Sequence, residues 1–348
     1  MIMNDRRTTN VRRSSIVVRC LIMNILFVRN GQERFVLDDL ALLSQEHTVT
    51  DWRQPGRWFD PVRLARRVRR CDLVFCWFAS WHALAPVLLA RAMGKPSVVV
   101  VGGYDTANLP QAGYGAQRGG LPRLVARTVI RQATVLVVNS QAARREAIAN
   151  AGADPAKISV IYHGVRPLPM GPLQREPLAL TVGNVWRENL LRKGLLPFVQ
   201  AAAHLPTVRF VLVGRWYDDS IQELKAMATP NVEFTGFVSD EELIGWYQRA
   251  SVYVQASLHE GFGLSVAEAM TASCIPVVSR AGALPEVVGN TGAYLDAPRP
   301  SLLAEGVKEV LAAASPTVRR VCRERILQQF PMQRREEMLI RVVGSAAR

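Results

Sequence analysis

The sequence predicts an α/β protein with parallel sheets in two domains. Short apolar runs alternate with segments of helical periodicity along the whole chain, which is the pattern of βαβ units. The length of 348 residues exceeds one ordinary core and suits two domains of about 150 residues each. A segment rich in proline and glycine, 164–177, separates two sets of alternating elements and indicates an interdomain linker, which we place at 167–177.

The amino-terminal domain is expected to cover 23–166. The short apolar run before it is interrupted by Arg19 and lacks a small-residue cleavage site, which argues against a signal peptide. Residues 1–22 are therefore predicted to be a disordered extension or an artefact of the choice of start site. The expected strands lie near 24–28, 47–51, 73–76, 97–101, 135–138 and 158–161. The expected helices lie near 33–43, 61–70, 82–93, 122–132 and 141–150.

The carboxyl-terminal domain is expected at 178–330. Its strands are predicted near 178–182, 209–213, 232–234, 252–255 and 276–278. Its helices are predicted near 195–204, 219–228, 240–249, 265–272, 300–314 and 317–330. Pro331 then breaks the chain before a last helix, 332–343, in a terminal segment of 331–348.

The chain is strongly basic, with a formal net charge of +14. Arginines concentrate in the first 19 residues, in 63–70 and in 118–131, all in the amino-terminal half. A basic face there suits nucleic acid, an anionic membrane surface or an acidic acceptor, although a generally arginine-rich composition would explain the charge equally well. No nucleic-acid-binding motif is present, so we expect no nucleic-acid partner.

Cysteine usage and hydropathy indicate the compartment. The five cysteines are scattered and lack metal-ligand spacing, which favours reduced, buried thiols in a cytoplasmic protein. No uninterrupted apolar stretch reaches about 18 residues, so no spanning helix is expected. Peripheral attachment at the inner face of the membrane stays open.

The stretch His-Glu-Gly-Phe-Gly-Leu-Ser-Val-Ala-Glu-Ala-Met at 259–270 carries the clearest chemical signal. A glycine turn leads into a helix, whose first N–H groups and dipole can hold a phosphate. Glu260 and Glu268 flank the turn, and carboxylates accept hydrogen bonds from sugar hydroxyls. An apolar run at 251–255 precedes the loop, which places it at the carboxyl end of a buried strand, where α/β sheets bind ligands. The alternative is a capping box in which Glu268 bonds the backbone N–H of Ser265.

These residues also carry a family resemblance. Glu260-x7-Glu268, followed by Cys-Ile-Pro-Val-Val-Ser-Arg-Ala-Gly-Ala-Leu-Pro-Glu-Val-Val at 274–288, resembles the donor site of the retaining glycosyltransferases of family 4. The resemblance covers residues 23 to 345 and is stronger in the carboxyl-terminal half. It implies the GT-B fold, in which two Rossmann-like doubly wound domains face each other across a cleft and the last helix returns to the first domain. The acceptor would bind the first domain and the nucleotide sugar the second.

The resemblance assigns roles within this stretch. Glu260 would lie near the donor sugar, and Glu268 would bind the ribose hydroxyls. The backbone N–H groups of Phe262, Gly263 and Leu264 would meet the sugar or the phosphates.

The basic segment 183–194 resembles the loop that neutralises the departing diphosphate in this family. Lys193 matches the family's Lys-Gly pair, while the position where the family often has arginine is Asn184 here. Either Arg187 or Arg192 would take the arginine's role, with Arg187 preferred; a solvated basic loop is the alternative. The backbone of Val238 would hold the donor base.

Two amino-terminal loops complete the site that the resemblance implies. Gly31 follows the first strand, where the family often has a Gly-Gly loop that approaches the phosphates. Asp105 follows the fourth strand, where many relatives have a histidine beside the reacting carbon, so it is the polar catalytic candidate there; the alternative is that it holds the adjoining Gly-Gly turn. The aromatic run 77–82 suits sugar stacking or lipid contact, and core packing is the alternative.

The predicted activity is retaining transfer of a sugar from a nucleoside-diphosphate sugar to an acceptor hydroxyl, in glycan, cell-surface polysaccharide or glycolipid synthesis. The resemblance implies no cofactor and no metal, because cationic side chains and helix ends serve the diphosphate. The departing phosphate would take the acceptor proton. A nucleotide-sugar epimerase of the same fold and a non-catalytic basic binding module remain alternatives. The expected partners are a glycan or lipid-linked acceptor and, as an open possibility, an anionic membrane surface; the oligomeric state is open.

Overall fold

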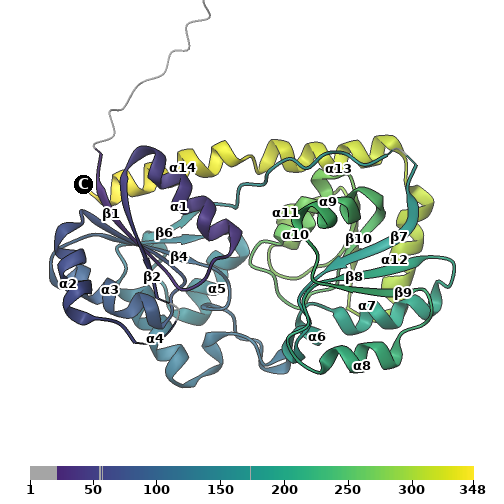
Figure 1. The fold of residues 1–348 in the computed structure, drawn as a ribbon, viewed down its shortest axis with the longest axis horizontal. Helices are drawn as coiled ribbons and strands as arrows, with labels where there is room; N and C mark the ends of the chain where they lie inside the picture. Colours follow the sequence, from purple (N-terminus) through teal and green to yellow (C-terminus); the bar gives the residue numbers. More distant parts are fainter. Residues whose placement is uncertain (1–21, 55, 57, 173) are drawn as a thin grey trace, which may run out of the picture.

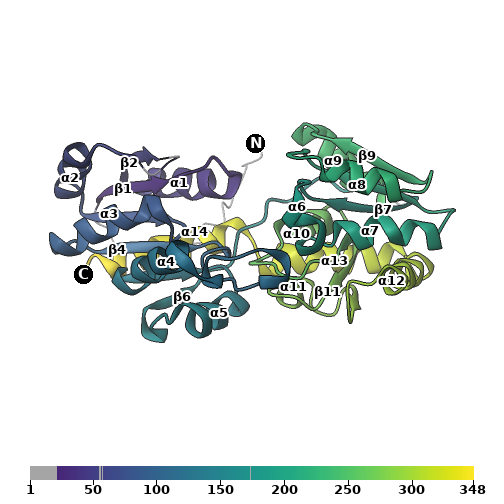
Figure 2. The ribbon, with the colours of Figure 1, turned by 90° about the horizontal axis from the view of Figure 1, so that it is seen from below.

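The computed structural model describes residues 22–54, 56, 58–172 and 174–348. It contains two six-stranded sheets, and all of the strand pairs in them are parallel (Figure 1). The two sheets belong to the two halves of the chain, which lie end to end along the long axis of the molecule (Figure 2). The predicted extension 1–22 lies outside the described residues except for Ile22.

The amino-terminal sheet has the strand order β2-β1-β3-β4-β5-β6. Its strands are β1 (Asn24–Arg29), β2 (Thr48–Arg53), β3 (Leu73–Trp77), β4 (Ser97–Val101), β5 (Val135–Val138) and β6 (Ile158–Val160). The helices between them are α1 (Arg34–Glu46), α2 (Pro61–Arg70), α3 (Trp81–Ala92), α4 (Gly120–Gln132) and α5 (Gln141–Ala151), with short 3-10 turns at Pro110–Ala112, Ala116–Arg118 and Pro155–Lys157.

Both faces of this sheet are covered, because side chains alternate along each buried strand. Alternate residues of β1, β3, β4 and β5 pack with α2, α3, α4 and α5 in one core cluster. The intervening residues pack with α1 and with the last helix of the chain in another. Trp77 belongs to this second cluster and is fully buried, so core packing accounts for it, and the stacking role is not available to that ring.

The carboxyl-terminal sheet has the order β12-β11-β10-β7-β8-β9, which is the Rossmann order. Its strands are β7 (Glu176–Val182), β8 (Arg209–Val213), β9 (Val232–Gly236), β10 (Ala250–Gln255), β11 (Ile275–Ser279) and β12 (Ala293–Leu295). Its helices are α6 (Arg187–Arg192), α7 (Leu195–Ala201), α8 (Ser220–Met227), α9 (Asp240–Arg249), α10 (Leu264–Thr271), α11 (Leu284–Val288), α12 (Pro300–Ala313) and α13 (Pro316–Gln329), and a 3-10 turn spans Ala202–His204.

Three of these elements were not predicted. The segment expected as a basic loop forms the short helix α6 from Arg187 to Arg192, while the helix predicted from 195 follows Gly194 as α7. Helix α11 has five residues and strand β12 has three, which is too short for periodicity to identify. The remaining predicted strands and helices correspond to observed elements, with ends shifted by a few residues.

The last helix, α14 (Met332–Ala346), packs against α1 in the amino-terminal half. Figure 1 shows α13 and α14 running along one side of both halves. The chain passes between the halves twice, after β6 and again between α13 and α14. The two passing segments touch where the Val165 N–H donates a hydrogen bond to the Phe330 carbonyl at 2.8 Å. Arg335 fixes the helix in place: its Nε and Nη2 bond the two carboxylate oxygens of Asp39 at 2.6 and 2.7 Å, and both side chains are buried.

Replacing Arg335 with leucine should therefore destabilise the chain strongly. Burial raises the pKa of Asp39, and Arg335 is the cation that offsets this effect. Removing one partner of a buried ion pair costs about 3–5 kcal/mol, and urea denaturation would measure that loss of unfolding free energy.

Arg166→Leu is the matched control. Arg166 pairs with the neighbouring Asp38, but its side chain is 51% exposed. Exposed pairs contribute less than about 1 kcal/mol, so the control should unfold nearly as the wild type does. Equal losses in the two variants would contradict the role assigned to Arg335.

Candidate active site

The strand order of the carboxyl-terminal sheet marks where a ligand would bind. Strands β7 and β10 are neighbours, and the chain winds away from them in opposite directions. Doubly wound sheets bind ligands beyond the carboxyl ends of the strands at this switch point. The segment after β7 leads through α6 to Lys193, and the segment after β10 leads to Glu260.

Glu260 is a buried carboxylate with three hydrogen bonds to one oxygen. Its Oε1 accepts from Lys193 Nζ at 2.5 Å, Ser257 Oγ at 2.9 Å and Gln255 Nε2 at 3.1 Å. Burial alone would raise the pKa of this carboxyl, but Lys193 and Arg192 outweigh burial and lower it below its ordinary value. Glu260 is therefore ionised at neutral pH and lies among cations.

The geometry of the turn explains why a glycine follows Lys193. Lys193 ends α6 and Gly194 adopts φ +68°, a conformation that L side chains rarely adopt. A Cβ on Gly194 would lie 2.1 Å from the carbonyl oxygen of Ala256, just beyond β10. Only glycine thus lets this turn approach the strand end closely enough for Lys193 to meet Glu260.

The two candidate arginines lie in different places. Arg187 has a 71% exposed side chain, pairs with Glu223 and lines a separate hollow of about 500 Å³. Arg192 is 8% exposed, and its charge acts on the carboxyl of Glu260. The geometry favours Arg192 as the companion of Lys193, although the sequence favoured Arg187.

The turn after Glu260 leads into α10 without a side-chain cap. Gly263 adopts φ +97°, and a Cβ on it would lie 2.9 Å from the side chain of Leu284. The backbone N–H groups of Phe262, Gly263 and Leu264 are those assigned to the donor. The Phe262 ring itself is buried, with the Phe330 ring centroid at 5.3 Å, so it anchors the turn.

Glu268 does not form the capping box that the sequence left open, because α10 begins at Leu264 and has no side-chain cap hydrogen bond. Its Oε2 accepts from the hydroxyl of Tyr247 at 3.3 Å. Burial raises the pKa of Glu268 to about 7. Arg34, the first residue of α1 in the other half, also acts on this carboxyl and pairs with Asp240 at 3.1 Å, so the loop between β1 and α1 ends beside this region.

Gly31 lies in that loop, and its carbonyl accepts from Arg29 Nη1 at 2.6 Å. Val238 lies between β9 and α9 and is partly buried against the core of the carboxyl-terminal half. The resemblance assigns Gly31 and Val238 contacts with the donor through their backbone groups. Nothing in their positions tests these contacts, which stay predictions.

Asp105 is fully engaged with backbone. Its Oδ1 accepts from Gly103 N–H at 2.9 Å, and its Oδ2 accepts from Ala79 N–H at 3.0 Å and Gly102 N–H at 3.3 Å. Burial raises the pKa of this carboxyl, and the same backbone N–H groups oppose that rise. This geometry favours the turn-holding role that the sequence left as the alternative.

The Gly-Gly turn that Asp105 holds touches the candidate site from the other half. A Cβ on Gly261 would lie 3.0 Å from the carbonyl oxygen of Gly102. The hydroxyl of Ser140 donates to the Gly261 carbonyl at 2.9 Å, and His259 Nε2 lies 2.9 Å from Glu146 Oε2. The two halves therefore meet at the loop that carries Glu260.

Glu286 and Tyr114 are two contributors that the sequence did not single out. Glu286 on α11 accepts from the first N–H groups of α5, at 2.8 Å from Gln141 and 2.7 Å from Ala142, and from the Tyr162 hydroxyl at 2.8 Å. Tyr114 of the amino-terminal half lies with its ring centroid 4.4 Å from the guanidinium of Arg192. Glu286 lies in the segment 274–288 that carries the family resemblance, but no role was assigned to it there, and Tyr114 lies in none of the motifs. Both residues act through contacts between the halves, which a local pattern does not record.

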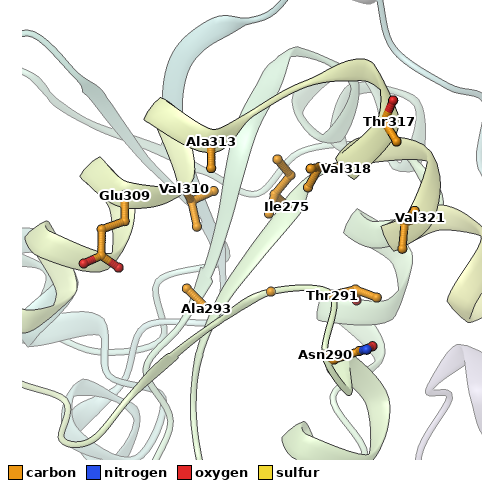
Figure 3. A pocket seen from close by; sticks show the side chains of 11 residues that line it. Ile275, Asn290, Thr291, Ala293, Glu309, Val310, Ala313, Thr317, Val318 and Val321 are labelled. Carbon is orange, nitrogen blue, oxygen red and sulfur yellow. The ribbon is translucent and has the colours of Figure 1, made fainter.

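Another hollow of the carboxyl-terminal half lies away from these residues (Figure 3). It has a volume of about 420 Å³ and is lined mainly by apolar side chains of β11, β12, α12 and α13, such as Ile275, Val310 and Val318. It opens beside the first residue of β11, whereas Glu260 follows the last residue of β10.

Within the described ranges no group of three or more His, Cys, Asp and Glu side chains is arranged to hold a metal.

Comparison with known families gives a match for each half. The model described as Glycosyltransferase Family 4 matches residues 27–167, and the model described as Glycosyl transferases group 1 matches residues 176–313.

O-antigen chain mannosyltransferase B of Escherichia coli is 34% identical over 125 residues, which are 34% of this chain and 32% of that protein. A GDP-mannose-dependent alpha-(1-6)-phosphatidylinositol dimannoside mannosyltransferase of Mycobacterium tuberculosis is 32% identical over 141 residues, 40% of this chain and 36% of that protein. The matched part therefore spans about a third of these curated relatives.

Solved structures resemble nearly the whole chain. Anabaena Alr3699/HepE, in complex with UDP, has a TM-score of 0.77 at 18% identity and covers 93% of this chain and 100% of its own. Sucrose-phosphate synthase of Thermosynechococcus elongatus has a TM-score of 0.71 at 19% identity and covers 92% of this chain and 98% of its own. With the two parallel sheets, these similarities confirm the GT-B fold.

The raised pKa of Glu268 predicts a pH-dependent contribution to stability. An unfolded chain ionises this carboxyl near its ordinary value of 4.5, and the folded chain ionises it at about 7. Between these two pH values the folded state keeps a proton that the unfolded state releases, so the unfolding free energy falls as the pH rises. The contribution of Glu268 to stability is complete below pH 4.5 and is lost as the pH rises through about 7. Urea denaturation across this range should show wild type losing stability relative to Glu268→Gln.

Glu242→Gln is the control with the opposite sign. The Ser239 backbone N–H lowers the pKa of Glu242, so its contribution should be lost as the pH falls below 4.5. Parallel pH profiles for wild type and Glu268→Gln would contradict the environment described for Glu268.

Proposed function

We propose that this chain, which belongs to the group 1 glycosyltransferases of family 4, transfers a sugar from a nucleoside-diphosphate sugar to an acceptor hydroxyl. The family membership rests on the two models, which together match residues 27–167 and 176–313. The observation that carries the activity is the meeting of Lys193, Arg192 and Glu260 beside the uncapped start of α10. Cations and helix N–H groups at one switch point suit a diphosphate that gains charge as it leaves.

The proposed reaction keeps the configuration of the sugar. The bond from the anomeric carbon to the β-phosphate oxygen breaks, and the acceptor oxygen bonds that carbon from the same face. The acceptor proton passes to the departing phosphate. The engagement of both Asp105 oxygens by backbone N–H groups supports this route, because that carboxylate is not free to act as a base. The diphosphate is neutralised by side chains and helix N–H groups, and we propose that no metal is needed.

The donor is proposed to bind along the carboxyl-terminal half. The carboxylate of Glu268 would accept hydrogen bonds from the ribose hydroxyls, and the backbone of Val238 would meet the base. The backbone at Gly31 would approach the phosphates from the other half. The Arg34–Asp240 pair, which joins the two halves near Glu268, supports this placement.

The curated relatives suggest which donor to test first. The two reported above are named as mannosyltransferases, and one is named as GDP-mannose-dependent. We therefore propose a mannosyl donor, with GDP-mannose as the first candidate and UDP-glucose, which one solved neighbour holds, as the second. Their names also point to a glycan or lipid-linked acceptor of cell-surface synthesis.

The test of the function is donor turnover. The purified chain should release nucleoside diphosphate from GDP-mannose or UDP-glucose slowly by hydrolysis, and faster when a suitable acceptor is added. The released or transferred sugar should keep its anomeric configuration by NMR. Release of an epimerised free sugar that no acceptor accelerates would contradict a transferase and support the epimerase alternative.

Variants of the cationic cluster test the assignment within the site. Lys193→Ala and Arg192→Ala should each lower kcat about 100- to 1,000-fold, the usual cost of removing one group that stabilises transition-state charge. Glu268→Ala should abolish turnover at ordinary donor concentrations, because the ribose contact is lost. Circular dichroism would check that each variant folds.

Arg187→Ala is the matched control, because it removes an arginine from the same helix. Its side chain pairs with Glu223 at the surface, so turnover should stay within about twofold of the wild type. A large loss in Arg187→Ala with normal turnover in Arg192→Ala would reverse the assignment.

We also propose that the amino-terminal half associates with an anionic membrane surface. Helix α2 exposes Arg63, Arg66, Arg67, Arg69 and Arg70. Just before it, Trp58 is 95% exposed, and Val62 in its first turn is 57% exposed. Basic and apolar side chains together suit the interface of a bilayer. None of the helices in the described ranges is long and apolar enough to cross a membrane.

Sedimentation with liposomes tests this surface. The chain should pellet with vesicles that contain phosphatidylglycerol and stay in solution with phosphatidylcholine vesicles. Trp58→Ser should reduce pelleting several-fold, because it removes the interfacial aromatic ring. Val321→Ser, which changes a 47% exposed residue on α13, should pellet like the wild type. Equal recovery with both lipids would contradict the proposal.

A further inference from the structure

Arg192 is a buried cation without a carboxylate in contact. It is 8% exposed, and its Nε and Nη2 both bond the neutral Asn189 Oδ1, at 3.0 and 2.5 Å. No ion pair in the described part of the chain includes Arg192, whereas the neighbouring Lys193 pairs with Glu260. Its charge acts on Glu260, but the ion pair of that carboxylate is with Lys193. A buried charge is costly unless it is paired directly, so this guanidinium is suited to meet an anion that arrives with the ligand.

The face of this guanidinium is covered from the other half of the molecule. The ring centroid of Tyr114 lies 4.4 Å from Arg192 Cζ, which is within cation–π distance. Burial raises the pKa of the Tyr114 hydroxyl to about 12, so the ring stays neutral at physiological pH. Asn189 therefore holds one edge of the guanidinium, and Tyr114 holds its face.

The segment that carries Tyr114 is built to present this ring. Tyr114 and Leu109 form an antiparallel bridge, and the Tyr104 carbonyl accepts from Ala116 N–H at 2.7 Å. The next residue, Gly115, adopts φ +106°, and a Cβ there would lie 2.0 Å from the carbonyl oxygen of Ala107. The segment is folded tightly on itself, so the ring position is fixed by the amino-terminal half.

The same segment reaches across to the carboxyl-terminal half. The 3-10 turn at Pro110–Ala112 contacts α6, and Figures 1 and 2 both show the chain before α4 extending toward that helix. The side chain of Glu188 lies 3.6 Å from where a Cβ of Gly113 would stand. Tyr114 thus approaches Arg192 only when the two halves are together.

We infer that Tyr114 is a positioning residue that orients the Arg192 guanidinium toward the donor diphosphate when the domains close. The inference rests on the proposed function, because it gives Arg192 the leaving diphosphate as its anion. The ring fixes the plane of the guanidinium, and the remaining N–H groups at its edge then point to one place. The amino-terminal domain in this way contributes to leaving-group stabilisation as well as to acceptor binding.

The test compares aromatic and aliphatic replacements in donor kinetics. Tyr114→Phe keeps the ring face and should retain kcat within about twofold. Tyr114→Leu removes the face and should lower kcat about 5- to 30-fold, the range of a desolvated cation–π contact, while the donor KM changes less than about threefold. This split is expected because the contact forms on closure and acts on the departing charge.

A double-mutant cycle separates this role from a general structural one. Arg192→Lys keeps the charge and loses the planar group that stacks. It should lower kcat at least as much as Tyr114→Leu, and adding Tyr114→Leu to it should cost less than about twofold more. Because Arg192→Lys leaves the Tyr114 segment unchanged, it also tests the inference should Tyr114→Leu not fold; turnover like that of the wild type would overturn it.

The outcomes distinguish this inference from the function on which it rests. Wild-type kcat in Tyr114→Leu, an equal loss in Tyr114→Phe, or additive losses in the double variant would each overturn the positioning role and leave the transferase intact. A wild-type chain that releases no diphosphate from any nucleotide sugar would overturn the proposed function, and the positioning role with it.

Discussion

The ion pair between Lys193 and Glu260 is the interaction on which the rest of the site depends. A buried carboxylate stays ionised only where cations outweigh the cost of burial, and Lys193 and Arg192 supply them. The same loop sets its neighbours: the Glu260 carbonyl accepts from Ala283 N–H at 3.0 Å, and a Cβ on Gly282 would lie 2.1 Å from that carbonyl oxygen. The charge pair thus joins the turn after β7 to the turn after β10, and the backbone of Glu260 joins that second turn to the start of α11.

Contacts between the halves converge on this loop. Glu286 on α11 caps the start of α5, Ser140 donates to Gly261, and His259 lies against Glu146. Separation of the halves would expose the first N–H groups of α5 and undo these bonds together. The arrangement of the candidate donor groups and the arrangement of the domains are therefore not independent, because both involve the loop 259–263 and helix α11.

The sequence identifies what local chemistry encodes and misses what packing decides. The parallel strands follow from buried apolar runs, and Glu260 and Glu268 stand out as carboxylates that flank a glycine turn. The role of Lys193 came from the family resemblance of its Lys-Gly pair. The sequence preferred Arg187 to Arg192, whereas the geometry favours Arg192, because the choice depends on which side of α6 faces β10. The sequence analysis missed Tyr114 for a similar reason. Its contact with Arg192 lies across the domain boundary, and no local pattern records it.

The return of α14 to the amino-terminal half has a consequence for biosynthesis. The first domain emerges early from the ribosome, yet the surface that receives Leu339 and Val343 stays open, and Asp39 lacks Arg335, until the last helix is made. Translation of the intervening domain takes about 10 to 30 s at usual rates, during which the nascent chain carries an exposed apolar strip beside an unpaired acid. The domain that is synthesised first is therefore the one that is finished last, and chaperones have their best opportunity to bind in that interval.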